Sequence, residues 1–230
     1  MNQQAFVNRV RARLGRSVAD GVPEWQPSLP IPDPGPTDTE ALVERYQAEL
    51  VKLSGNSYRV SSEAEIAPLV VRILKESGVS GHVVRWDDPL LNGLGLDEAL
   101  GAAGFPVTPV KHGEPGRPQV ELVEQAVAGI TGADFAIAET GTLVMGSSRP
   151  GEAGAPGRGR TVSLLPPVHI AVVRKEQFVY TAAQVFQRLR QMGVLPSQVI
   201  FASGPSRSAD IENDLSIGVH GPAQVHVIII

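Results

Sequence analysis

The sequence contains no cysteine among its 230 residues. Disulfides, iron–sulfur clusters, thiolate zinc sites and cysteine nucleophiles are therefore excluded for this chain. No apolar run approaches the roughly 18 residues that a membrane-spanning helix needs. The first residues also lack the long apolar core of a secretory signal. We therefore expect a cytoplasmic protein that does not contact a membrane.

Charge is sparse and nearly balanced. Lys and Arg together number 20 and Asp and Glu 24, so the net charge is −4. Binding to phosphate backbones needs a concentrated basic face, so we expect no nucleic-acid partner. The phosphate-loop and dinucleotide fingerprints are absent, and no two histidines have metal-ligand spacing on one helix. The sequence predicts no metal site and no cofactor.

Glycine and proline are abundant instead, with 24 and 19 residues. Six of the prolines fall between positions 23 and 36. They follow a short helical stripe formed by Phe6, Val10 and Leu14. Proline removes backbone donors and favours extended geometry. We therefore divide the chain into an N-terminal helix with a proline-rich arm over 1–36 and a main domain over 37–230.

The main domain alternates between apolar stripes of helical period and short apolar runs. Thr181 with Gln184 forms a capping-box signature at the start of one helix. This alternation predicts a three-layer α/β/α fold with a mainly parallel sheet, and a mixed patch over 142–173. The expected helices lie near 42–53, 62–77, 97–103, 120–130, 181–192 and 208–215, and the expected strands near 57–60, 82–86, 105–110, 135–138, 143–145, 161–165, 168–173, 199–202 and 225–230.

One candidate site is the turn after the predicted strand 135–138. Glu139 ends this strand, and two threonines then flank a glycine in Thr140-Gly141-Thr142. Ligands of open α/β sheets bind beyond the carboxyl ends of strands. Hydroxyls and free backbone N–H groups suit a carboxylate or phosphate. The alternative is a tight hairpin whose threonines satisfy their own backbone.

A second candidate follows the predicted strand 199–202. A Gly/Ser loop leading into a helix N-terminus favours an anion, and Arg207 offers a bidentate clamp. In the alternative, Arg207 only pairs with the acidic residues of the next turn. The predicted ligand-binding residues of this loop are Gly204, Ser206, Arg207, Ser208 and Asp210.

Two histidines and an arginine-rich loop complete the candidates. His220 lies in a turn close to the second loop and is expected to face the same pocket. His169 lies in an apolar strand, where it is either a buried structural residue or an acid/base group near the active end. Arg149, Arg158 and Arg160 belong to a loop that either closes over an anionic ligand or is solvated.

Several segments taken together resemble the LUD-domain family, in particular its lactate-utilisation protein C (LutC/YkgG) group. The matching stretches are residues 9–16, 129–144, 164–173, 204–212 and 218–222. Glu139 stands where this family often has Asp, and Ser208 where Thr is common. The resemblance implies a NagB/RpiA/CoA-transferase-like fold. It also implies a part in oxidising L-lactate to pyruvate alongside iron–sulfur partner proteins.

Three functional hypotheses follow. In the first, the chain is a subunit of an L-lactate utilisation system that binds a small carboxylate or phosphorylated ligand between the two loops. In the second, it is a stand-alone acyl- or CoA-transferase-like enzyme with Glu139 as nucleophile and His169 as a further catalytic residue. In the third, it is a scaffold that docks iron–sulfur partners through its first helix and proline arm.

Overall fold

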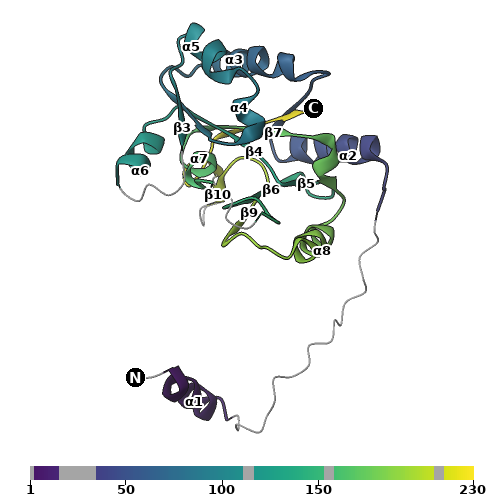
Figure 1. The fold of residues 1–230 in the computed structure, drawn as a ribbon, viewed down its shortest axis with the longest axis vertical. Helices are drawn as coiled ribbons and strands as arrows, with labels where there is room; N and C mark the ends of the chain where they lie inside the picture. The colour runs from purple at the N-terminus through teal and green to yellow at the C-terminus, as the bar shows by residue number, and fades with distance from the viewer. Residues whose placement is uncertain (1–2, 16–34, 111–116, 153–157, 210–214) are drawn as a thin grey trace. The chain divides into compact units, whose positions relative to one another are not determined.

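The computed structural model describes residues 3–15, 35–110, 117–152, 158–209 and 215–230 (Figure 1). The chain divides into two units, Met1–Asp33 and Pro34–Ile230. The first contains helix α1 (Gln3–Arg13), which agrees with the helix predicted there. Most of the proline-rich stretch lies outside the described residues. No helix in the described ranges is both long and apolar enough to cross a membrane.

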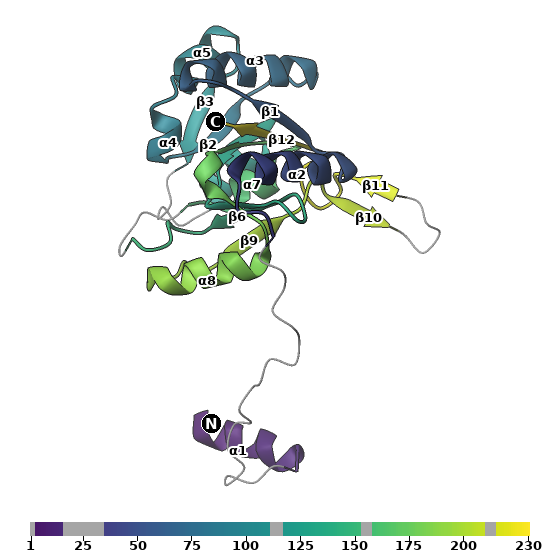
Figure 2. The same cartoon turned by 90° about the vertical axis from the view of Figure 1, so that its right-hand side faces the viewer.

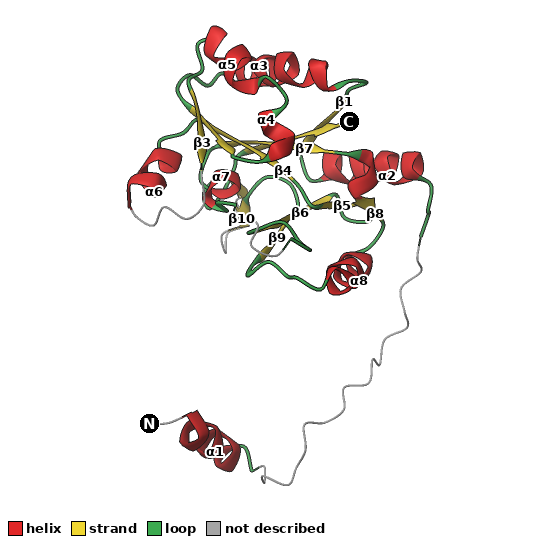
Figure 3. Cartoon of the chain, in the orientation of Figure 1, coloured by secondary structure: helices red, strands yellow, loops and turns green. Residues whose placement is uncertain are grey.

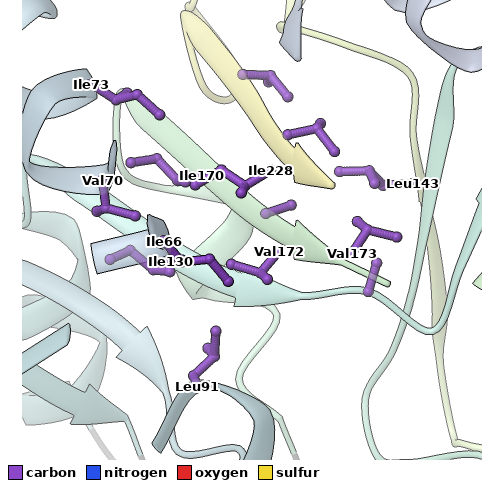
Figure 4. Packing of buried hydrophobic residues seen from close by; sticks show 14 of the residues in the cluster. Ile66, Val70, Ile73, Leu91, Ile130, Leu143, Ile170, Val172, Val173 and Ile228 are labelled. Carbon is purple, nitrogen blue, oxygen red and sulfur yellow. The ribbon is translucent and has the colours of Figure 1, made fainter. Parts of the chain in front are cut away.

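The second unit is organised around a six-stranded parallel sheet, as the sequence predicted. Its central strands consist of buried, mostly β-branched residues, whose side chains pack on both faces of the sheet. Figure 4 shows Ile130, Ile170, Val172 and Ile228 meeting in this core. The strand order is β1 (Asn56–Arg59), β12 (Gln224–Ile229), β7 (Val168–Val173), β4 (Ala128–Gly132), β2 (Val83–Trp86) and β3 (Val107–Val110).

Helices cover both faces of this sheet (Figure 1). Helix α3 (Ile66–Glu76) presents Ile66, Val70 and Ile73 to one face and contacts α5 (Leu96–Ala102). Helix α7 (Thr161–Leu164) lies on the opposite face against β4. The remaining helices are α2 (Thr39–Lys52), α4 (Pro89–Asn92), α6 (Arg117–Glu124) and α8 (Ala182–Met192), with 3-10 turns at Glu63–Glu65 and Lys175–Gln177.

A second, four-stranded mixed sheet packs beside α8 (Figure 3). Val185 and Leu189 of α8 join Ile137 and Val144 in a separate small core. The predicted capping box of Thr181 and Gln184 starts this helix. The strand order is β8 (Phe178–Val179), β5 (Phe135–Ile137), β6 (Thr142–Gly146) and β9 (Val199–Ala202), antiparallel except between β8 and β5.

The helix predicted over 208–215 is wrong. Strands β10 (Arg207–Ala209) and β11 (Leu215–Ile217) form an antiparallel pair that projects from the body of this unit (Figure 2). Ser208 pairs with Ser216 in this ladder. Residues 210–214, including Asp210, lie outside the described part of the chain. Pairing with the next strand of the chain overrides the local cap signals that suggested a helix.

Two further elements differ from prediction. Helix α6 ends at Glu124, and Ile130 belongs to strand β4, not to a helix. A strand buried on both faces has no alternation, so its apolar residues matched a helical spacing by chance. Conversely, the predicted strand 161–165 is helix α7, which ends just before Pro166.

Gly129 in β4 permits an unusually close approach of α7. A Cβ at this position would lie 1.8 Å from the carbonyl oxygen of Val162, a backbone atom that has no rotamer to escape into. The central strand and the covering helix therefore depend on the absence of a side chain here.

We expect Gly129→Ala to lower the free energy of unfolding by at least about 1–3 kcal/mol, because α7 must move away from β4. Gly101→Ala is the matched control, since a Cβ there meets nothing within 4 Å and Ala favours a helix. Urea unfolding of both variants measures the difference. Equal stabilities would contradict this account of the packing.

Candidate functional site

The carboxyl edge of the parallel sheet contains a topological switch point between β2 and β4. After β2, the next strand of the parallel sheet is β3 on its outer side, whereas the next strand of this sheet after β4 is β7 on the opposite side. Connections that diverge from neighbouring strands leave a crevice at their carboxyl ends, which is where open α/β sheets bind ligands. Asp88 follows β2 and Asp134 follows β4, so each wall of this crevice supplies a carboxylate.

Arg158 bridges the two walls. Its Nε and Nη2 donate to Asp88 Oδ2 at 3.1 and 2.8 Å, and its Nη1 donates to Asp134 Oδ1 at 2.7 Å. The guanidinium also lies over the ring of Trp86, 4.9 Å from its centre. Arg158 and Asp88 are buried, so solvent screens this network little.

A second arginine approaches from the same loop. Arg149 Nη2 lies 3.0 Å from Asp88 Oδ1, which also accepts the backbone N–H of Leu90 at the start of α4. Arg149 Nη1 lies 3.5 Å from Glu152. Asp88 is thereby satisfied by two cations and one backbone donor, which fixes its position at the end of β2.

The two carboxylates differ in their proton affinity. For Asp88, burial favours the neutral form, but Arg158, the Leu90 N–H and Arg149 outweigh it, so its pKa is lowered. For Asp134, burial dominates over Arg158 and the Gly146 N–H, and the charge of Asp88 adds to it, so its pKa is raised. Two neighbouring carboxyls with opposite shifts are typical of functional sites.

A cavity of about 300 Å³ opens beside this network. Arg149 and Arg174 are its more exposed cations, with side chains 32% and 46% exposed. Gln177 at its rim donates to the carbonyl oxygen of Ala133. The lining residues are Asp88, Leu90, Gly132, Ala133, Asp134, Phe135, Arg149, Pro150, Glu152, Arg158, Arg174, Gln177 and Met192.

The Glu139–Thr142 turn is the tip of the β5–β6 hairpin, so its strand belongs to the mixed sheet and not to the parallel one. Glu139 and Thr140 are exposed. The Thr140 and Thr142 hydroxyl oxygens lie 2.7 Å apart. Gly141 has φ 62° and sits against the end of α2, where a Cβ would lie 2.8 Å from the Leu50 nitrogen.

The second loop lacks the helix N-terminus that suggested an anion site, because Arg207 begins a strand. Arg207 is exposed and donates to the Ser54 hydroxyl at 2.7 Å. Ser206 donates its N–H to Pro222 O, and its own carbonyl accepts the Gly218 N–H, which ties the loop to the turn containing His220. His220 itself is exposed. Asp210 and Glu212, the acidic residues that would pair with Arg207 in the alternative interpretation, lie outside the described residues.

The two loops nevertheless lie side by side. Thr142 Oγ1 is 2.7 Å from Ser203 Oγ. Gly204 packs against Leu53, next to Arg207 on Ser54. They do not meet at a shared carboxyl edge of parallel strands. They meet because β6 and β9 are antiparallel, so the start of β6 faces the end of β9.

His169 lies far from the carboxyl edge, as the second residue of β7. It is buried, and its Nε2 lies 2.8 Å from the Thr131 hydroxyl. Burial, with a smaller effect of His226, lowers its pKa to about 4. A neutral, hydrogen-bonded histidine within the sheet fits the structural interpretation better than an acid/base role at the crevice.

Sequence reasoning missed both carboxylates of the crevice. The strand 82–86 was predicted, so the strand-end rule alone would have pointed to Asp88. Asp134 was hidden because β4 was read as part of a helix. Of the arginine-rich loop that the sequence offers as a candidate, Arg149 and Arg158 line the cavity, whereas Arg160 donates to Gln198.

Comparison with known proteins now adds to this geometry. The family model of the LUD domain matches residues 43–230. The chain belongs to the LUD domain family. Within it, the chain is 35% identical to lactate utilization protein C of Bacillus subtilis over a 242-residue alignment, covering all of this chain and 96% of that protein. The corresponding protein of Geobacillus sp. is 32% identical over an alignment of the same length.

A solved structure supports the fold of this LUD-domain chain. It is a DUF162 family protein from Deinococcus radiodurans, with a TM-score of 0.56 and 21% identity. The match covers 84% of this chain and 99% of that one. It agrees with the α/β architecture described above.

We expect Arg158→Met to lower the free energy of unfolding by about 3–5 kcal/mol near neutral pH, because it removes the cation that pairs with the carboxylate of Asp134 and leaves Asp88 with Arg149 alone. Arg160→Met, on the same loop but exposed, should change it by less than about 0.5 kcal/mol.

The deficit of Arg158→Met should shrink as the pH falls, since protonation removes the uncompensated charges. In the unmodified chain, Asp88 makes the fold less stable as the pH falls. Its lowered pKa contributes stability above the ordinary pKa of 3.8, and this contribution is lost as the pH falls through the pKa of the folded state. Denaturant unfolding across acidic pH measures both trends. A pH-independent deficit would contradict the bridging role.

Proposed function

We propose that this LUD-domain chain takes part in L-lactate utilisation and binds a small carboxylate in the crevice between β2 and β4. The process is suggested by two relatives, both of which are named lactate utilization protein C. The observation that carries the site is the Arg158 bridge between Asp88 and Asp134, at the switch point and beside a cavity. This position replaces the loop pair suggested by the sequence as the leading candidate.

The rim arginines are the groups that suit an incoming anion. Arg158 already donates to Asp88 and Asp134 through three of its N–H groups, so it fixes the position of the two carboxylates. Arg149 and Arg174 pair with Glu152 and Glu63, whose side chains are about half exposed. Such exposed pairs are worth only about 0–1 kcal/mol. A ligand carboxylate therefore replaces these partners at little cost and gains a planar, two-pronged donor.

Asp134, which lines the crevice, suits the hydroxyl group of a 2-hydroxy acid. Asp134 lines the cavity, accepts from Gly146 N–H through Oδ2 and from Arg158 through Oδ1, and keeps further lone pairs on both oxygens. A ligand hydroxyl donates to such an oxygen while its carboxylate faces Arg149. Lactate carries both groups on adjacent carbons.

The proposed role also requires partner proteins. Oxidation of lactate to pyruvate releases two electrons and two protons. A chain without cysteine holds no thiolate-bound cluster to accept the electrons. We therefore assign electron transfer to iron–sulfur proteins of the same system.

A second candidate site is the loop pair around Thr140, Thr142, Ser203 and Arg207. It is favoured by one observation, the chain of three hydroxyls joined at 2.7 Å per step. Hydroxyls beside an exposed arginine suit a phosphorylated ligand. Glu139 stands next to them as the nucleophile of the transferase alternative.

Calorimetric titration with L-lactate and with pyruvate tests the proposal. Arg149→Ala should weaken binding at least roughly tenfold, the equivalent of one lost charged hydrogen bond. Glu152→Gln should strengthen binding, because it removes a competing carboxylate. Arg160→Ala, a neighbour on the same loop that bonds to Gln198, is the matched control and should bind normally.

An outcome in which Arg207→Ala abolishes binding while Arg149→Ala does not would move the site to the loop pair. Absence of binding by the unmodified protein to either acid would overturn the carboxylate proposal itself.

A further inference from the structure

One stretch of this chain differs sharply in charge from the rest. Residues 177–209 contain three arginines, Arg188, Arg190 and Arg207, and no Asp or Glu. The whole chain has net charge −4. The stretch includes β8, α8, β9 and β10, so the charge bias falls on elements that are consecutive in the chain.

Within the described residues, the arginines of this stretch have no acidic partner. Arg188 and Arg190 are exposed on α8, and neither forms an ion pair with any residue that the structure describes. Among the residues that the structure describes, Arg207 donates to a neutral hydroxyl, that of Ser54. By contrast, ion pairs are formed elsewhere in this unit by Arg45, Arg59, Arg72, Arg85, Arg149, Arg158 and Arg174.

Large apolar side chains are exposed on the same elements. Phe186 of α8 and Phe201 of β9 are 58% and 39% exposed, and their ring centres lie 5.7 Å apart. Leu195, in the connection between the two elements, is 62% exposed. Helix α8 packs Val185 and Leu189 mainly against strands β5 and β8. Strand β9 is therefore covered by α8 less than these strands are.

Strand β9 is also the edge of the mixed sheet (Figure 3). Among the described strands, its ladder partner is β6 alone. Natural edge strands are commonly guarded by charged side chains or proline. The sequence of β9, Val-Ile-Phe-Ala, has neither. Every second residue of such an edge directs its N–H and C=O outward, where another strand can pair with them.

We propose that the α8–β9 face, defined by Phe186, Arg190, Leu195, Phe201 and the open edge of β9, docks an extended segment of a partner protein that is both apolar and acidic. The apolar side chains of the partner cover the two phenylalanines, and its carboxylates supply the missing counter-charge to Arg190. A second copy of this chain is a poor occupant, because the same acid-free stretch would face itself.

Site-specific photo-cross-linking of the full chain in its native host tests this. Phe186 is replaced by photo-reactive p-benzoylphenylalanine, and the cross-linked peptides are identified by mass spectrometry. We expect one dominant partner segment, from another protein, with more Asp and Glu than Lys and Arg. The matched control carries the photo-reactive residue at Val120 on α6, which is 47% exposed.

Adding Arg190→Glu to the Phe186 probe should reduce the cross-link at least fivefold, whereas Arg190→Lys should retain most of it. The melting temperature and the lactate affinity of both variants should be unchanged, so a fault in the crevice is distinguishable from a fault in docking. Cross-linking mainly to a second copy, to a segment without acidic excess, or no more than at Val120 would overturn the proposal. A cross-link yield that Arg190→Glu leaves unchanged would also overturn the proposal.

Discussion

The ion bridge of Arg158 is the interaction on which the described structure most depends. It joins the ends of β2 and β4 to the loop that leads into α7, and Trp86 shields it from above. Asp134 also receives the Gly146 N–H from the last residue of β6. One guanidinium thus links the parallel sheet to the mixed sheet. A buried charge of this kind is costly unless every partner is in place, so the bridge specifies one arrangement of the two sheets.

The parallel sheet was largely readable from sequence because β2, β7 and β12 are compact apolar runs. Strand β4 was not, because the spacing of Val120, Val123, Val127 and Ile130 imitates a helix while the strand is buried on both faces. The β10–β11 pair was missed for a related reason. In the sequence, Ser208 and the acidic residues that follow it resemble helix caps, and only the pairing of Ser208 with Ser216 decides between the two structures.

The candidate site was harder to predict than the fold, since its members are distant in sequence. Arg158 is separated by 70 residues from Asp88 and by 24 from Asp134. No spacing rule connects such positions; they meet because sheet order brings β2 and β4 together. The local motif at Thr140-Gly141-Thr142 attracted attention because it is contiguous, yet its strand belongs to the mixed sheet. A contiguous motif can be recognised in the sequence, whereas Asp88 and Asp134 come together only through the order of the strands in the sheet.

The contacts of α2 give that motif a different meaning. Gly141 and Gly204 both have positive φ and both lie against the last turn of α2, where a Cβ would come within 2.8 Å of the Leu50 nitrogen or the Leu53 Cβ. Any protein that keeps a helix wedged against this hairpin and loop needs glycine at both places, whatever it binds. A shared Thr-Gly-Thr signature would then report common architecture, and proteins carrying it are free to differ in substrate.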